Sequence, residues 1–199
     1  RMKPNKALAF ALAGFSLGGG FAAAEEPAVG DAAAGQLVAA QCRVCHGMDG
    51  VAKIPVAPHI GGEPAAYIVD QLNAFREDAR EHEMMNVVAK TLEDDQIADV
   101  AAYYAGLRPV VAQAFAKPGA APPENCVGCH GETGISVVED APNLAGENEI
   151  YIMTQLKAFR TGQRAHEVMS DIAATYSDAE LYPAAEWYAS FRFSTKPAD

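Results

Sequence analysis

The residues best suited to chemistry in this chain are two copies of a Cys-x-x-Cys-His pentapeptide, one from Cys42 to His46 and one from Cys126 to His130. Cysteines at this spacing can form thioethers with the two vinyl groups on one edge of a porphyrin. The adjoining histidine then lies beneath the iron as its axial ligand. Because the chain has only four cysteines, the two motifs account for all of them. The motifs therefore predict two covalently bound haem c groups, attached at Cys42, Cys45, Cys126 and Cys129, with His46 and His130 as metal ligands.

The sixth ligand of each iron should come from matching positions, because the second half of the chain repeats the first at a constant offset of 84 residues. Met85 and Met169 each follow their proximal histidine by 39 residues, whereas Met84 has no counterpart. A thioether is a soft, neutral donor that favours ferrous iron and raises the reduction potential. We therefore predict Met85 and Met169 as metal ligands. A second matched pair, His82 and His166, leaves bis-histidine ligation open, which would lower the potential.

Further residues are predicted to support the haems. Pro58 and Pro142 can each present a backbone carbonyl to the free N–H of a proximal histidine and so fix its orientation. Four arginines could hold haem propionates through charge-assisted hydrogen bonds, namely Arg76, Arg80, Arg160 and Arg164. These residues also have a plainer interpretation, as loop prolines and solvated helix side chains. His59 has no partner in the repeat, where Asn143 takes its place, and is expected to be a loop residue.

The repeat extends over more than forty residues without insertion or deletion. The matched pairs include Glu63 and Glu147, Tyr67 and Tyr151, Gln71 and Gln155, and Phe75 and Phe159. Such self-similarity predicts a duplicated unit, with each half folding around its own haem. The expected organisation is a signal peptide or retained anchor at 1–24, a first domain at 25–108, a linker at 109–123 and a second domain at 124–199.

The local patterns predict helices and no strand, so the predicted fold class is all-α. Asp31 can cap a helix that runs toward Gln41. Pro64 can begin a second helix, since its missing N–H costs nothing there. Thr91 with Asp94 is typical of the N-cap of a third helix.

The second half departs from the first at both ends. A proline-rich stretch displaces the helix expected before Cys126, which is either shortened or moved back to 110–116. Pro183 should kink the last helix or delay its start.

Charge and the N-terminal segment suggest where the chain works. The formal net charge is −11, and −14 without residues 1–24, which argues against binding to nucleic acid and leaves cationic protein partners or an uncharged docking patch open. Residues 1–24 combine a basic start, an apolar stretch and an A-x-A site, which is typical of a secretory signal. The apolar run is short and glycine-rich for a membrane span. We therefore expect export to the periplasm, with cleavage favoured over membrane attachment through this segment.

As a set, these motifs resemble the dihaem class I cytochromes of the cytochrome c4 type. The second half carries Pro142-Asn-Leu-Ala-Gly146, then Tyr151-x-x-x-Gln-Leu-x-x-Phe-x-x-Gly-x-Arg164, then Met169. The first half carries the same series, with Asp78 in place of the glycine, and the resemblance covers about residues 31–192. It implies two tandem class I cytochrome c domains related by a pseudo-twofold, with haem propionate edges facing each other. The dihaem subunit of flavocytochrome c sulfide dehydrogenase has a similar layout.

The combination predicts an exported electron carrier rather than an enzyme. With both axial positions filled, substrate cannot reach the iron, and two haems allow relay between a donor and an acceptor docked at different domains. Expected partners are a cytochrome bc complex, a haem-copper oxidase or a flavoprotein dehydrogenase subunit. The alternative is the dihaem electron-accepting subunit of a flavocytochrome c enzyme of the sulfide dehydrogenase type.

Two other classes are disfavoured. A catalytic dihaem protein needs a cysteine ligand or an open iron, whereas here the cysteines serve attachment and both halves offer a methionine. A zinc module fails because the two cysteine pairs lie 84 residues apart.

Overall fold

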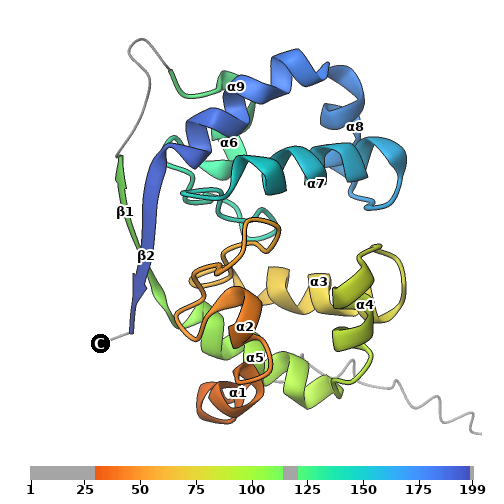
Figure 1. Ribbon diagram of the computed structural model, residues 1–199, viewed down its shortest axis with the longest axis vertical. Coiled ribbons are helices and arrows are strands. Elements are labelled where there is room, and N and C mark those ends of the chain that lie inside the picture. Colours follow the sequence, from red (N-terminus) through yellow and green to blue (C-terminus); the bar gives the residue numbers. More distant parts are fainter. Residues whose placement is uncertain (1–29, 114–120, 198–199) are drawn as a thin grey trace, which may run out of the picture.

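The computed structural model describes residues 30–113 and 121–197, which form two helical units lying one above the other and a two-stranded sheet along one side (Figure 1). The helices of the first unit are α1 (Ala32–Ala39), α2 (Arg43–His46), α3 (Ala65–Arg76), α4 (Glu83–Ala89) and α5 (Asp94–Ala105). Those of the second unit are α6 (Glu124–His130), α7 (Glu149–Thr161), α8 (Glu167–Thr175) and α9 (Asp178–Ala189). The strands are β1 (Arg108–Gln113) and β2 (Phe191–Lys196). The mostly helical fold agrees with the sequence prediction.

The first unit is built on the packing of α1 against α5. Asp31 caps α1 by accepting the Ala33 N–H at 2.8 Å, as predicted, and its own N–H donates to Asp99 of α5 at 2.7 Å. Gly35 allows this close approach, because a Cβ there would lie 1.9 Å from the Asp99 carbonyl oxygen. The buried residues of this core are Val38, Ala39, Ile68, Leu92, Ile97, Val100, Ala101 and Tyr104.

The predicted cap of the third helix is wrong. Glu93 is the N-cap of α5, and its N–H donates to the Gln96 side-chain oxygen at 3.0 Å in a capping box. The hydroxyl of Thr91 instead donates to the Val88 carbonyl at 2.7 Å, at the end of α4. Thr91 therefore closes one helix rather than opening the next.

The second unit packs around its own core, with α7 in contact with α8 and α9. Its buried residues are Ala145, Ile152, Leu156, Leu181, Ala185, Trp187, Tyr188 and Phe191. Pro183 lies inside α9, which already begins at Asp178, so the predicted delayed start is wrong. The reason is a capping box between Ser177 and Glu180, which starts the helix before the proline is reached.

The strand pair was not predicted. β1 and β2 are antiparallel, with Arg108 opposite Lys196 and Val111 opposite Phe193. Residues 110–113 are therefore extended, and the prediction of a helix over 110–116 is wrong for them; residues 114–116 lie outside the described ranges. The β-branched Val110 and Val111 favour this conformation. The helix before Cys126 is the shortened alternative, because α6 begins at Glu124.

The sheet links the two units. β2 leaves the second unit and runs down beside the first (Figure 1), where the Thr195 hydroxyl donates to the Asp49 carbonyl at 2.6 Å. The predicted signal segment lies outside the described residues. Across 30–113 and 121–197, no helix has the length and apolarity needed to span a membrane.

Candidate haem sites and the interface between them

Each Cys-x-x-Cys-His motif lies on a short helix that ends at its histidine. Gly47 and Gly131 follow with φ near +72°, so the chain turns sharply away after α2 and α6. Buried tyrosine hydroxyls fix both turns, from Tyr104 to the Gly47 carbonyl at 3.0 Å and from Tyr188 to the Gly131 carbonyl at 3.2 Å. The two motifs are thus held in the same way in both units.

The two proximal histidines are buried and oriented by a backbone carbonyl. The Nδ1 atom of His46 lies 2.9 Å from the Pro58 carbonyl oxygen, and that of His130 lies 2.8 Å from the Pro142 carbonyl oxygen. This is the contact that the sequence analysis expects. Burial lowers the pKa of both imidazoles, which favours the neutral form with its proton on Nδ1. Nε2 then keeps its lone pair for a metal.

Met85 and Met169 occupy the third position of α4 and α8 and are half-buried, whereas Met84 is 60% exposed. His82 and His166 are the N-caps of these helices. Their Nδ1 atoms accept the Met85 and Met169 N–H groups, each at 3.3 Å. His82 and His166, the alternative iron ligands, thus have a capping role, and each methionine lies three residues after its N-cap histidine.

These donor sets fit haem c. The four cysteines are free thiols, and each pair shares a helical turn with a neutral imidazole. Burial raises the pKa of Cys126 and, together with Cys45, raises that of Cys42 to about 11. Both side chains are therefore uncharged thiols, unlike the thiolates of a zinc site.

Arg80 and Arg164 lie between the units, each only 7% exposed. Arg80 donates to Tyr151 at 3.2 Å and to Gln155 at 2.5 Å, both in the second unit. The mirror-image contacts of Arg164 are with Tyr67 at 2.8 Å and Gln71 at 2.9 Å in the first unit. A β-bridge between Arg80 and Arg164 joins the backbones at the same place.

Both guanidinium groups carry charge into this interior. Among the described residues their hydrogen-bond partners are neutral, and they stack over Phe75 and Phe159, each 4.4 Å from the ring centroid. Burial lowers the pKa of Arg80, and the nearby Arg164 lowers it further. Buried cations require a counter-charge. Haem propionates would supply it here, so the contacts favour this role for Arg80 and Arg164.

Arg76 and Arg160 face elsewhere. Arg76 pairs with Asp94 at the start of α5, and Arg160 pairs with Asp178 at the start of α9, both at 2.6 Å. Each arginine thus pairs with an aspartate in the first turn of a helix of its own unit, and the role of Arg76 and Arg160 as propionate ligands stays a prediction.

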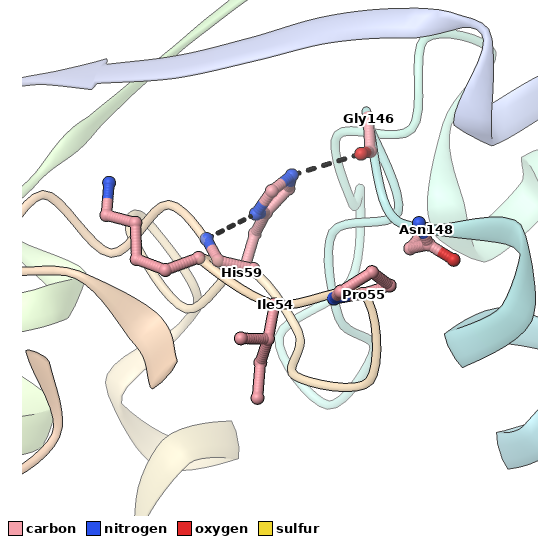
Figure 2. A pocket seen from close by; sticks show the side chains of 7 residues that line it. Ile54, Pro55, His59, Gly146 and Asn148 are labelled. Atoms are coloured by element: carbon pink, nitrogen blue, oxygen red, sulfur yellow. Dashed lines mark hydrogen bonds between the residues drawn. The ribbon is translucent and has the colours of Figure 1, made fainter. Parts of the chain in front are cut away.

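His59, expected to be a loop residue, lies in the interface (Figure 2). Its Nδ1 accepts the Ala52 N–H at 2.9 Å, so Nε2 carries the proton and donates to the Gly146 carbonyl at 3.0 Å. Its ring stacks on Phe193 of β2 with centroids 4.7 Å apart. Burial lowers the pKa of His59, which favours this neutral form.

Asn143 makes the equivalent contacts from the second unit. Its Oδ1 accepts the Ser136 N–H and its Nδ2 donates to the Gly62 carbonyl, both at 2.9 Å. Histidine and asparagine look unlike in the repeat, yet each offers one acceptor and one donor on a short stem. That shared property is the signal by which the sequence could have revealed the pair.

Glu63 and Glu147 complete the interface and are 4% and 2% exposed. Glu63 Oε2 accepts the Asn143 N–H at 2.9 Å, and Glu147 Oε1 accepts the His59 N–H. Burial raises the pKa of both carboxyls, to about 8 for Glu147, and Glu147 raises that of Glu63 further. The two glutamates occupy equivalent positions of the sequence repeat, but the sequence pattern alone indicates no role for them.

Two cavities adjoin these contacts. The first has a volume of about 250 Å³ (Figure 2) and is lined by Ala52, Lys53, Ile54, Pro55, His59, Gly146 and Asn148. The second, of about 180 Å³, is lined by residues of both units: Val56, His82, Ile150, Tyr151, Thr154 and Gln155. The second cavity therefore lies beside Tyr151 and Gln155, which bind Arg80, and beside His82, the N-cap of α4.

Comparison with known proteins gives consistent matches. A protein-family model described as cytochrome c oxidase, cbb3-type, subunit III, matches residues 30–103. The chain is 34% identical over 172 residues to the thiosulfate dehydrogenase electron acceptor of Thiomonas intermedia, covering 76% of this chain and 79% of the relative. It is 32% identical over 171 residues to cytochrome c4 of Pseudomonas aeruginosa, covering 77% and 85%.

Solved structures agree. Reduced recombinant cytochrome c4 from Pseudomonas stutzeri superposes with a TM-score of 0.72 at 26% identity, covering 82% of this chain and 100% of that chain. Thiosulfate dehydrogenase from Marichromatium purpuratum superposes with a TM-score of 0.69 at 28% identity, covering 81% of this chain but 40% of that chain. The match over the full length of a cytochrome c4 confirms the predicted fold of two tandem cytochrome c domains.

Proposed function

The chain belongs to the cytochrome c4 family of dihaem class I cytochromes c, and on this premise we propose that its two units each hold one covalent haem c and pass electrons between them. The chain is an electron-transfer cytochrome and not an enzyme. The boundaries predicted from the sequence, 25–108 and 124–199 with a linker at 109–123, are part of this proposal; β1 begins at Arg108 and continues into the predicted linker.

The observation that carries the proposal is the duplicated buried interface around Arg80 and Arg164. Each arginine is held by a glutamine of its own unit and by a tyrosine and a glutamine of the other. Because the surrounding ligands are neutral, two anionic groups can approach there from opposite sides and gain charge-assisted hydrogen bonds. This supports haem propionate edges that meet at the boundary, which keeps the path for the electron short.

Within each unit the residues have defined roles. Cys42 and Cys45 hold the first haem, and Cys126 and Cys129 hold the second, while His46 and His130 are the proximal ligands. The Pro58 and Pro142 carbonyls hold the Nδ1 protons, which leaves the Nε2 lone pair of each histidine available to a metal. Met85 and Met169 would supply the second protein ligand of each iron and exclude water from it. When bound, haem c supplies a one-electron couple between ferric and ferrous iron.

The direct test is the haem content and the axial ligation. We expect two haems per purified chain, and a ferric absorption spectrum with the weak red band of methionine–iron coordination. Met85→Ala and Met169→Ala should each remove about half of this band. If the band is absent from the wild-type protein, bis-histidine ligation through His82 and His166 becomes the better account. If the band survives both substitutions, Met85 and Met169 are not the ligands and another methionine is.

The donor and acceptor follow from the relatives by analogy. We propose an exported, periplasmic carrier that receives electrons from a dehydrogenase of the thiosulfate dehydrogenase type and delivers them to a haem-copper oxidase, in line with relatives named as acceptors of that enzyme. A reduction assay tests this, because such a dehydrogenase at catalytic concentrations should reduce the isolated protein. Native purification then shows which protein accompanies it. A flavoprotein that purifies with it in fixed ratio would instead identify a flavocytochrome c subunit.

A further inference from the structure

The peptide group between Pro58 and His59 is hydrogen-bonded at both ends. Its carbonyl oxygen lies 2.9 Å from His46 Nδ1, within the first unit. Its N–H donates to Oε1 of Glu147, which belongs to the second unit. One rigid peptide plane thus lies between the proximal histidine of one unit and a buried carboxyl of the other.

The second unit contains the mirror image. The peptide group between Pro142 and Asn143 lies 2.8 Å from His130 Nδ1 through its carbonyl oxygen. Its N–H donates to Oε2 of Glu63, in the first unit, at 2.9 Å. The same chain of groups therefore occurs twice, each time crossing the boundary between the units.

We propose that Glu63 and Glu147 are crossed positioning residues, each setting through one peptide group the basicity of the proximal histidine in the opposite unit. This inference rests on the proposed function, since it needs a haem on each histidine. Hydrogen bonds in a chain polarise one another. A negative charge on Glu147 strengthens the His59 N–H bond, makes the Pro58 carbonyl a better acceptor, and so raises electron donation from His46. Greater donation by the axial ligand favours ferric iron and lowers the reduction potential.

The second oxygen of the Glu147 carboxyl is not held by a partner in the described part of the chain. Glu147 Oε2 is buried and has no hydrogen-bond partner among the described residues. A carboxyl in that position can lose or gain a proton without breaking a salt bridge. The coupling between the units is therefore variable and depends on the proton occupancy of each carboxyl.

The titratable and charged groups around the two carboxyls are few. Glu147 raises the pKa of Glu63, and Tyr67 lies close enough to Glu63 and to both buried arginines to be influenced by all three. His59 is neutral, and its pKa is influenced by Asp49, Lys53 and His46 of its own unit. The packed strands carry Arg108, Arg192 and Lys196. A pH-dependent step in the reduction potentials near neutral pH can be assigned to Glu63 or Glu147 if substitution of that carboxyl removes the step.

The experiment uses the dihaem protein with the single substitutions Glu63→Gln and Glu147→Gln, which keep the shape and the N–H acceptor. Glu139→Gln, at an exposed position, is the control for net charge. The midpoint potential of each haem is measured against pH, with the two haems distinguished by their NMR haem-methyl resonances. In the wild type, both potentials should fall as pH rises through the ionisation of the carboxyls. Glu147→Gln should remove this step from the first-unit haem, and Glu63→Gln from the second-unit haem.

A crossed pattern supports the proposal, and two other patterns overturn it: each substitution acting on the haem of its own unit, or both acting equally on both haems. If either variant fails to fold, the wild type gives an independent readout. In the reduced protein, the amide protons of His59 and Asn143 should move downfield together with the potential steps as pH rises, and unmoved amide signals would reject the coupling. A protein without two haems would contradict the proposed function itself, and that result is seen before any titration.

Discussion

Glu147 shows what a single buried group does to the stability of the whole interface. Its carboxyl is 2% exposed, and burial raises its pKa to about 8 from an ordinary value of 4.5. Between these pH values the folded chain holds a proton that the unfolded chain has lost. The free energy of unfolding therefore falls as pH rises through this window and levels off above it.

We expect Glu147→Gln to flatten this dependence. The wild type should lose on the order of a few kcal/mol more stability between pH 5 and pH 8 than the variant does. Denaturant unfolding of the dihaem protein at both pH values measures the difference, with Glu139→Gln as the exposed control. Parallel pH profiles for wild type and Glu147→Gln would show that the carboxyl does not titrate in this window.

At the scale of elements, the helices that present the methionines depend on unusual caps. His82 caps α4 and His166 caps α8 with an imidazole nitrogen, where serine, threonine, aspartate or asparagine is more common. The cap bonds reach the N–H of Met85 or Met169 itself. Loss of the cap should therefore loosen the methionine along with the first turn.

His82→Ala should destabilise the first unit by about 1 kcal/mol and weaken the methionine–iron band of its haem. His82→Asn should restore both, because a carboxamide oxygen can accept the same N–H. Unfolding and the ferric spectrum are compared in the two variants, with the second haem as internal reference. Equal loss of the band in both variants would indicate that the imidazole itself, and not the cap, is required.

The loops between the units depend on two glycines with left-handed backbone. Gly62 and Gly146 have φ of +75° and +71°, and their carbonyls accept the bonds from Asn143 and His59. A Cβ on Gly146 would lie 2.6 Å from the Phe193 Cβ of β2. Both the backbone and the space therefore exclude a side chain.

Gly146→Ala should cost about 1–3 kcal/mol and separate β2 from the interface. Gly162→Ala is the matched control, because Gly162 has a similar φ of +79° but no atom within 4 Å of a built Cβ, so it should cost only the backbone part, about 1 kcal/mol. Denaturant unfolding of the two variants gives the comparison. A neutral Gly146→Ala would mean that the loop can shift away from β2 without cost.

At the scale of the whole molecule, the duplication determines how much can be predicted from sequence. The haem motifs, the proline carbonyls and the cap at Asp31 lie within short stretches, so local spacing was enough to expect them. The β1–β2 pair joins residues that lie between 78 positions (Gln113 and Phe191) and 88 positions (Arg108 and Lys196) apart in the chain, and strands of six residues carry too weak a pattern to be recognised alone. The roles of Glu63, Glu147 and His59 arise only when two units face each other, which a repeat in sequence does not specify.

The summed charge of the molecule should control how fast it meets its partners. The formal charge of the chain is −11 before any haem propionate is counted. Opposite charges steer association at low salt, and the Debye length shrinks from about 30 Å at 0.01 M to about 8 Å at 0.15 M. For a basic redox partner, we expect the second-order electron-transfer rate, followed by stopped-flow absorbance, to fall roughly tenfold or more over this range.

With an anionic small oxidant such as ferricyanide the sign reverses, because salt then screens repulsion, and the rate should rise. If the rate depends on salt concentration in opposite directions for the two reagents, the effect is due to charge and not to a change in the protein. If the rate with the basic partner does not change with salt, the docking contact lies on an apolar surface.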